Sequence, residues 1–200
     1  MDEAAETVAW SGAYDENGLP HGKGKLVYPS RAASDEEDRP KDQYEGELQA
    51  GVRQGSGIYT WANNASYTGR YERNVREGKG VMQFPGGARY EGEWQANKMH
   101  GEGVYTYANG DQYQGTFNEN RKHGLGAYWS QESQTSSIGE WKAGEFVKGD
   151  CAMKDGFKWT GTKGAKGYQG TFVNMRCGTA QAGSFGTDRW NSSGPLQTSI

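Results

Sequence analysis

The sequence lacks the long apolar segments that mark membrane-spanning and secreted proteins. No run approaches roughly 18 apolar residues, and the N-terminus has no signal-like apolar stretch. These absences predict a protein of the cytoplasm. The two cysteines, Cys151 and Cys177, fit free thiols in a reducing compartment, and a disulfide between them is an alternative that the sequence leaves open.

Neither charge nor aliphatic content is high. The formal net charge is −3 at pH 7, and the Lys and Arg residues are interspersed with acidic ones, so we predict no basic groove and no nucleic-acid partner. Hydrophobic residues make up 33% of the chain, too little for a thick two-layer core, yet 12% aromatic residues are too many for disorder. With 32 glycines, this composition fits an elongated sheet of nearly one layer.

A repeated unit accounts for most of the chain. The letters YEGEW at Tyr90 return as YQGTF at Tyr113, 23 residues later, and the same register continues back to Tyr67 and Tyr44. We predict a repeat array over residues 10–178, with units that start near residues 10, 44, 67, 90, 113, 137 and 168 and an acidic insertion at 31–41. An acidic leader, residues 1–9, precedes the array, and a Ser/Gly-rich tail, residues 179–200, follows it.

Each unit has the pattern of a β-hairpin. Large apolar residues alternate with polar ones in two short segments, which is the signature of strands with one apolar face. Turn-forming residues join these segments. Because one isolated hairpin is marginally stable in water, stacking is what would stabilise the array. The sequence therefore predicts an all-β fold, an elongated single-layer antiparallel sheet of stacked hairpins.

Glycines recur at the third, twelfth and fourteenth places of the unit, on the same side as the rings. The space that a missing side chain leaves allows a ring from the neighbouring strand to lie across the backbone, so we interpret these glycines as packing positions. They are Gly46, Gly55, Gly57, Gly69, Gly78, Gly80, Gly92, Gly101, Gly103, Gly115, Gly124 and Gly126.

The aromatic residues would line one side of the sheet, with no second layer in the sequence to cover them. Neighbouring rings must bury part of their area, but a concave strip edged with hydroxyl groups also suits an extended peptide, a partner helix or a second sheet. Exposed edge strands leave self-association open as well. We predict a partner-binding groove formed by Tyr44, Tyr59, Trp61, Tyr67, Tyr71, Phe84, Tyr90, Trp94, Tyr105, Tyr107, Tyr113, Phe117 and Tyr128.

Residues that invite a catalytic or metal-binding interpretation mostly belong to the repeat. His21, His100 and His123 take the same place in their units, and stacked hairpins would hold neighbouring copies roughly 10 Å apart, too far to share a zinc ion. We expect them to be turn residues. Lys163 and Lys166 lie among glycines and could either wrap an anion or belong to a solvated loop. We predict no enzymatic activity, no catalytic residue, no metal and no cofactor.

The unit, written as Tyr-x-Gly-x-Trp, Asn-x-x-x-His-Gly-x-Gly and an aromatic strand ending near Asn-Gly, closely resembles the MORN repeat (membrane occupation and recognition nexus). Residues 90–109 follow that pattern almost throughout, whereas Gln54 and Glu77 stand where the family usually has His. Among MORN proteins, the chain is similar to those of the ciliary radial spoke head, because it is short, has an acidic leader and begins with a longer hairpin.

The resemblance implies a non-catalytic structural subunit of the axoneme, in the cytoskeleton of a cilium or flagellum. Its partners would be other proteins of a multi-subunit assembly, the radial spoke head. The alternative is a membrane- or phosphoinositide-associated adaptor or another cytoskeletal scaffold. The sequence has no basic stripe, lipidation motif or amphipathic helix, which counts against membrane contact.

Overall fold

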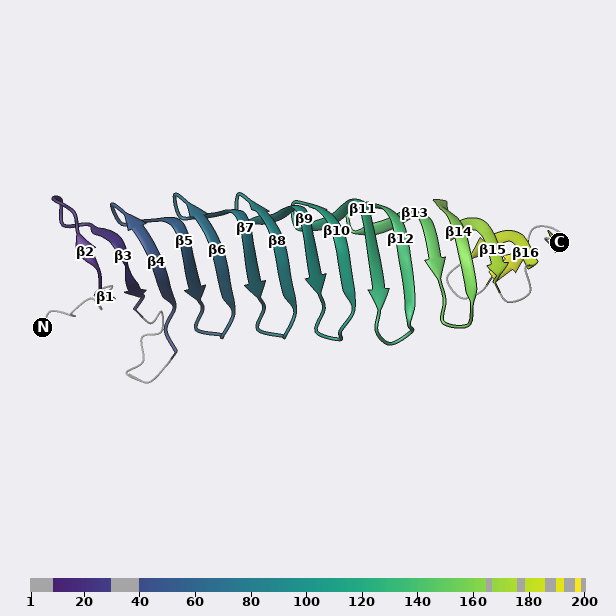
Figure 1. Ribbon diagram of the computed structural model, residues 1–200, viewed down its shortest axis with the longest axis horizontal. Coiled ribbons are helices and arrows are strands. Elements are labelled where there is room, and N and C mark those ends of the chain that lie inside the picture. Colours follow the sequence, from purple (N-terminus) through teal and green to yellow (C-terminus); the bar gives the residue numbers. More distant parts are fainter. Residues whose placement is uncertain are drawn as a thin grey trace, which may run out of the picture. The chain divides into compact units, whose positions relative to one another are not determined.

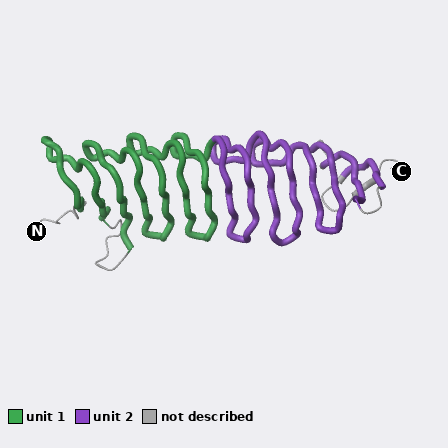
Figure 2. The backbone as a smooth tube through the Cα atoms, in the orientation of Figure 1, with its two compact units in different colours: residues 1–100 green, residues 101–200 purple. Residues whose placement is uncertain are grey.

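The computed structural model describes residues 9–29, 40–164, 167–175, 179–185, 190–192 and 197–198. Residues 1–8 of the predicted leader and residues 31–39 of the predicted insertion at 31–41 lie outside these residues. The chain divides into two units, residues 1–100 and 101–200 (Figure 2). Every regular element in the described residues is a β-strand.

The first unit is a sheet in which neighbours in the chain are neighbours in space. From β3 to β8 each strand pairs antiparallel with the next, and both β1 and β2 pair with β3 (Figure 1). The strands are β1 (Ala9–Trp10), β2 (Ala13–Tyr14), β3 (Pro20–Val27), β4 (Gln43–Gln49), β5 (Val52–Thr60), β6 (Ser66–Glu72), β7 (Val75–Gln83) and β8 (Arg89–Gln95).

The second unit continues the same topology. From β9, which begins just before the boundary, to β16, each strand pairs antiparallel with the next, and both β17 and β18 pair with β16. The strands are β9 (Lys98–Thr106), β10 (Gln112–Asn118), β11 (Arg121–Ser130), β12 (Thr135–Lys142), β13 (Glu145–Ala152), β14 (Phe157–Gly164), β15 (Gly167–Asn174), β16 (Thr179–Phe185), β17 (Trp190–Ser192) and β18 (Gln197–Thr198).

These pairings confirm the prediction of an all-β, open antiparallel sheet of stacked hairpins. Strands β16, β17 and β18 lie in the segment 179–200, which the sequence pattern assigned to a tail. There β16 pairs with β15 along its whole length, and Gly183 stands opposite Gly170. The glycine pairing of the repeat therefore extends into that segment.

The hairpin tips are two-residue turns in which both residues have positive φ. These turns are Ala50-Gly51, Arg73-Asn74, Ala96-Asn97, Glu119-Asn120 and Ala143-Gly144, with φ from 48° to 94°. Such mirror-image turns match the twist of the flanking strands, and Asn or Gly tolerates their second position best. Because the turns are so short, His100 and His123 lie in strands β9 and β11, and the expectation that they are turn residues was wrong.

Glycines of the third and fourteenth places face one another across the strands and lie under a tyrosine ring. Gly46 stands opposite Gly57. A Cβ atom on Gly57 would be 2.4 Å from ring atoms of Tyr44, so only glycine fits. The same ring contact occurs at Gly69, Gly80, Gly115 and Gly126. In the register, Gly92 stands opposite Gly80, and Gly103 opposite Gly115.

The twelfth-place glycines have a different reason from the one that the sequence suggested. Gly55 has a φ of +68°, and the β4–β5 register shifts beside it, between Gly46 and Glu47. A left-handed glycine next to a register shift is a feature of β-bulges. Positive φ, from 55° to 68°, is shared by Gly55, Gly78, Gly101 and Gly124. Backbone conformation, rather than room for a ring, accounts for glycine at this place.

Aromatic rings make up most of the core of both units. The first-place tyrosines, Tyr44, Tyr67, Tyr90 and Tyr113, have no exposed surface. Each hydroxyl donates a hydrogen bond to the backbone carbonyl three residues ahead, at O···O distances of 2.9 to 3.2 Å. Burial therefore leaves no polar atom of these side chains unsatisfied.

Candidate partner-binding surface

Most of the predicted groove residues are buried in the sheet. Tyr44, Tyr59, Tyr67, Tyr71, Tyr90, Trp94, Tyr113 and Phe117 are each at most 8% exposed. Edge-to-face contacts join them, such as the 5.2 Å between the ring centroids of Tyr67 and Trp94. These rings hold the sheet together and have almost no area left for a partner. The half-buried members of the set are Trp61, Phe84, Tyr105, Tyr107 and Tyr128.

Cationic side chains at the tenth place of the unit cover the buried rings. The Arg53 Cζ atom lies 5.1 Å from the ring centroid of Tyr59, and the Arg76 Cζ atom 4.5 Å from that of Trp94. In the second unit, the Lys122 Nζ atom lies 4.2 Å from the ring centroid of Trp141. A cation over a ring face is attracted by the ring quadrupole. The aromatic side of the sheet is thus a layer of rings under charged side chains.

Asparagines in the hairpin tips hold the arginines in place. The Asn74 side-chain oxygen accepts hydrogen bonds from the Arg53 backbone N–H (2.9 Å) and from its Nε (3.2 Å). Asn97 does the same for Arg76, at 2.9 and 3.4 Å. Each Asn therefore ties its own hairpin to the preceding one. This role was not predicted from the sequence, although the Asn that recurs at 74, 97 and 120 was a signal that could have revealed it.

At the eleventh place of the unit, Gln54 and Glu77 stand where the family usually has histidine, and both contact the following hairpin. The Gln54 side-chain oxygen accepts a hydrogen bond from the backbone N–H of Arg73 (3.0 Å), and the Glu77 carboxylate accepts one from that of Ala96 (2.9 Å). Both acceptors meet a backbone donor in the tip of the following hairpin. Gln54 and Glu77 therefore serve as contacts between hairpins.

Aspartates close the opposite ends of two hairpins. The Asp42 carboxylate accepts hydrogen bonds from the Tyr59 hydroxyl and the Ala62 N–H, each at 2.8 Å. In the second unit, Asp111 accepts from the Tyr128 hydroxyl and, at 2.8 Å, from the Gln131 N–H. Those two donors hold the pKa of the Asp111 carboxyl below its ordinary value. Through these hydrogen bonds, the two aspartates fix the loops in which their partners lie.

The half-buried rings at the eighteenth place, which we call the rim rings, are Tyr28, Trp61, Phe84 and Tyr107. Tyr28 and Trp61, with Arg53 and Tyr59, line a hollow of about 740 Å³. The Trp61 ring lies 4.6 Å from that of Tyr59 between centroids. The Tyr28 ring also packs against that of Tyr59, at 5.6 Å between centroids. All four rim rings keep an open side and can contact a partner, and three of them, Trp61, Phe84 and Tyr107, belong to the predicted groove.

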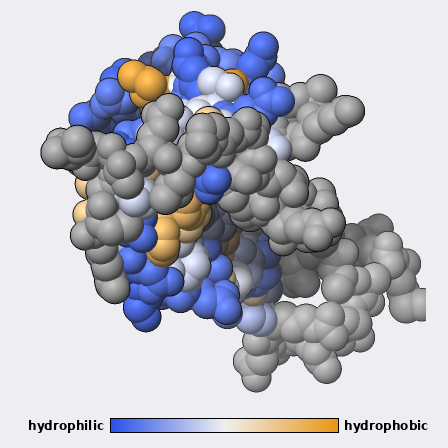
Figure 3. Space-filling model, turned by 90° about the vertical axis from the view of Figure 1, so that its right-hand side faces the viewer, coloured by the Kyte–Doolittle hydropathy of each residue, from blue (hydrophilic) through white to orange (hydrophobic). Residues whose placement is uncertain are grey.

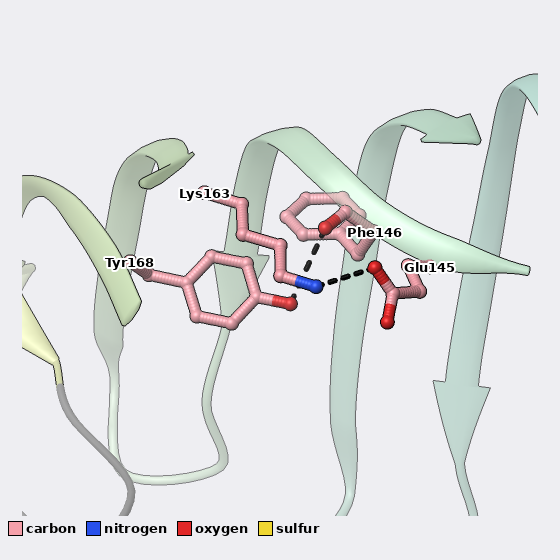
Figure 4. Close-up of polar contacts among 4 residues, drawn as sticks. All are labelled: Glu145, Phe146, Lys163 and Tyr168. Atoms are coloured by element: carbon pink, nitrogen blue, oxygen red, sulfur yellow. Dashed lines mark hydrogen bonds and ion pairs between the residues drawn. The ribbon is translucent and has the colours of Figure 1, made fainter. Parts of the chain in front are cut away.

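The lysines and histidines that the sequence suggested as anion or metal ligands either have a partner within the protein or lie at the surface. Lys163 on β14 makes an ion pair with Glu145 on β13, with 2.5 Å between Nζ and Oε2 (Figure 4), and Lys166 lies outside the described residues. Lys163 therefore has a partner of its own, which removes the reason to assign it an anion. His21 and His123 are exposed, and His100 is half-buried.

No chemical centre is apparent in the part of the chain that the structure describes. There, no three His, Cys, Asp or Glu side chains come together to hold a metal ion. Cys151 is a half-buried free thiol, and Cys177 lies outside the description. The described residues contain no helix that is long and apolar enough to cross a membrane. The described surface in Figure 3 is mostly hydrophilic, with hydrophobic atoms in small patches.

Comparison with known families agrees with this architecture. The chain matches the MORN repeat at residues 16–32, 44–66, 67–89, 90–112 and 113–133, which is more than half of its length. A search of curated proteins gave no match. MORN repeats generally mediate interactions with proteins or membranes. Four of the matched segments coincide, to within one residue at the start, with the hairpins β4–β5, β6–β7, β8–β9 and β10–β11. The chain belongs to the MORN repeat family.

Proposed function

We propose that this protein is a non-catalytic scaffold that binds other proteins, as a subunit of the radial spoke head in motile cilia or flagella. Membership of the MORN family supports the interaction role. The likeness of its short array and acidic leader to radial spoke head MORN proteins supports the axonemal one. Under this proposal the protein works in the cytoplasm, within the ciliary cytoskeleton.

The observation that carries the interaction role is the contrast between buried and rim rings. Tyr44 and Tyr67 are fully buried, whereas Trp61 and Phe84, in the same two hairpins, keep part of their area open. Large rings on a rigid sheet lose little conformational freedom when they bind, which makes them good anchors for a protein partner. Trp61 and Phe84 are rim rings of successive hairpins, so an extended protein segment could contact both rings at once.

Affinity purification tests this proposal. The tagged protein is recovered from ciliated and non-ciliated cells, and its stoichiometric partners are identified by mass spectrometry. We expect other radial spoke head proteins from ciliated cells, and their loss in the double variant Trp61→Ala with Phe84→Ala. The matched control is Ile58→Ala, whose side chain is 43% exposed and points to the opposite face of β5 from Tyr59.

Two outcomes would contradict the proposal. Absence of radial spoke head proteins from the wild-type sample would remove the axonemal role, and undiminished recovery by a folded rim-ring variant would remove the surface. Binding to vesicles of anionic lipid that weakens with salt, in place of protein partners, would instead support the alternative of a membrane-associated adaptor.

A further inference from the structure

The cation at the tenth place of the hairpin β10–β11 lacks the polar partner that its counterparts have. In the first unit, the Arg53 side chain donates a hydrogen bond to the side-chain oxygen of Asn74. Arg76 donates in the same way to Asn97. Lys122 takes the corresponding place in the second unit, but its ammonium makes no hydrogen bond or ion pair with any residue that the structure describes. Its charge is therefore not matched within the described part of the chain.

The hairpin tip that follows Lys122 explains this difference. The tips after Arg53 and Arg76 carry an asparagine, and the backbone N–H of Asn97 donates to the Arg76 carbonyl at 3.2 Å. At the corresponding tip, the Gly144 N–H donates in the same way to the Lys122 carbonyl at 2.9 Å. The backbone contact between hairpins is thus kept, but glycine has no side-chain oxygen to offer the ammonium.

Four aromatic rings surround the Lys122 ammonium on the side of the sheet. The distances from its Nζ atom to the ring centroids are 4.2 Å for Trp141, 4.8 Å for Tyr128, 5.5 Å for Tyr113 and 6.0 Å for Tyr107. Ring faces attract a cation, but they are weak acceptors for its N–H groups. Burial beside the rings disfavours the charged form and lowers the pKa of Lys122. The ammonium thus has attractive neighbours but no strong acceptor.

The ammonium nevertheless reaches solvent. Among the described residues, the Nε1 atom of Trp159 is the only buried side-chain nitrogen or oxygen that lacks a hydrogen-bond partner. Because the Lys122 Nζ atom also lacks a partner, it is not a buried atom, although the side chain as a whole is half-buried. One of its four rings, Tyr107, is a rim ring. A partner that contacts this rim ring therefore comes within reach of the ammonium.

The charge of the site favours one class of ligand. A partly desolvated cation without a partner is stabilised by an anion that accepts its N–H groups, and such charge-assisted hydrogen bonds are stronger than neutral ones. A single ammonium matches the single charge of a carboxylate. A phosphate monoester carries about −1.5 to −2 charges at neutral pH. The guanidinium groups that suit phosphate best are held by asparagines in this protein.

We propose that Lys122 is a binding site for the carboxylate of an aspartate or glutamate in a protein partner that docks on the neighbouring rim ring, Tyr107. The inference rests on the proposed function, because the carboxylate belongs to a protein that the rim rings bind. The acidic side chain supplies the acceptor that Asn74 and Asn97 supply in the first unit. A bound carboxylate favours the charged ammonium and therefore raises the pKa of Lys122.

The test compares two peptides in NMR titrations of the full chain, with isotope-labelled lysine Cε atoms. Acetyl-Leu-Glu-Leu-amide has a carboxylate, and acetyl-Leu-Gln-Leu-amide has a neutral amide of the same shape. We expect the Glu peptide to shift the Lys122 Cε resonance in a saturable way and to raise the pKa of Lys122. It should bind at least about tenfold more tightly than the Gln peptide. Inorganic phosphate is the third probe, and tighter binding of phosphate than of the Glu peptide would overturn the proposal in favour of a lipid headgroup.

Variants distinguish a carboxylate site from a lysine that only covers the rings. Lys122→Met introduces the residue that the preceding hairpin has at this place, Met99, and should abolish the preference for the Glu peptide, followed at the Trp141 indole N–H. Lys122→Gln replaces this variant should it not fold. Lys122→Arg keeps the charge and should keep the preference. The control is Lys142→Met, which removes an exposed lysine of β12 and should leave the preference unchanged.

Two results would overturn the proposal. These are equal affinity of the wild type for the two peptides and an unchanged preference in a folded variant that lacks the Lys122 charge. Recovery of partners by the rim-ring variant is measured separately. Failure of the carboxylate site is therefore distinguishable from failure of the scaffold function.

Discussion

The hairpins β6–β7 and β14–β15 have the same pattern of strand pairing but differ in the aromatic side chain that covers their glycine pair. Both place glycine opposite glycine, as Gly69 and Gly80 do in the first and Gly161 and Gly170 in the second. In the first, Tyr67 lies over the glycines and its hydroxyl is hydrogen-bonded. In the second, a tryptophan takes that place with its N–H unmet. The hairpin β14–β15 therefore keeps the glycine pair, although the side chain over it is no longer a hydrogen-bonded tyrosine.

The polar contacts of the two regions differ as well. In the first unit, Arg76 lies over Trp94 and is held by Asn97. Around β14, cations pair with exposed carboxylates instead, as in Lys158–Asp150 (2.7 Å) and Lys163–Glu145 (2.5 Å). Surface ion pairs contribute little to stability, whereas a cation over a ring also covers apolar area. The comparison indicates that the ring layer, rather than strand pairing alone, sets the local stability.

Substitution of a first-place residue should show the largest difference in unfolding free energy between the regular hairpins and the region around β14. We expect Tyr67→Ala to lower the free energy of unfolding by about 4 kcal/mol, because it removes a fully buried ring from the core. Ser137→Ala, at the first place of the hairpin β12–β13 that pairs with β14, should lower it by less than about 1 kcal/mol, because it removes only a hydroxyl group. Urea unfolding measures both changes. Equal losses of unfolding free energy in the two variants would contradict the difference that we infer between the two regions.

The next largest effect concerns the glycines. Gly80→Ala should lower the free energy of unfolding by about 3 kcal/mol, because its Cβ would be 2.4 Å from the Tyr67 hydroxyl oxygen in a core with no room to move. Gly86→Ala is the control in the following turn, where a Cβ would meet nothing within 4 Å. A Gly80 variant as stable as the control would show that the ring contact is unimportant.

A smaller effect is expected from the cationic side chains at the tenth place, which lie over the rings. Arg76→Ala should lower the free energy of unfolding by about 1–2 kcal/mol, because it removes both the contact with Trp94 and the hydrogen bonds to Asn97. Lys163→Ala, which removes only a surface ion pair, should have a clearly smaller effect. Thermal unfolding of both variants ranks them. The reverse ranking would contradict the role assigned to the tenth place.

The last prediction concerns the stability of the fold at alkaline pH, which depends on the buried tyrosines. Burial raises the pKa of Tyr44, Tyr67 and Tyr113 to about 12. A phenol with a raised pKa in the folded state contributes stability that is fully present below its ordinary pKa of about 10 and lost as the pH rises to about 12. Unfolding should therefore become easier between these values. Absorbance titration of tyrosinate, alongside circular dichroism, checks this, and buried tyrosines that ionise near pH 10 in a folded sheet would contradict it.

The sequence predicted the hairpins because alternation and turn residues are local and repeat at a fixed spacing. It did not predict which rings are buried, because that depends on residues of neighbouring hairpins. The tenth place holds Arg53, Arg76 and Lys122, and their position over the rings follows only from the pairing of the strands. The bulge at Gly55 was missed for a similar reason, since its positive φ is visible only against the partner strand.

Amide hydrogen exchange tests most directly the claim that the ring layer sets local stability. The account predicts that amides of β6 and β7, under the filled layer at Tyr67, exchange at least about tenfold more slowly than those of β14 and β15, beside a hollow that Ser137 and Cys151 line. Equal exchange in both hairpins, or slower exchange in β14 and β15, would show that strand pairing alone determines stability and would contradict the account.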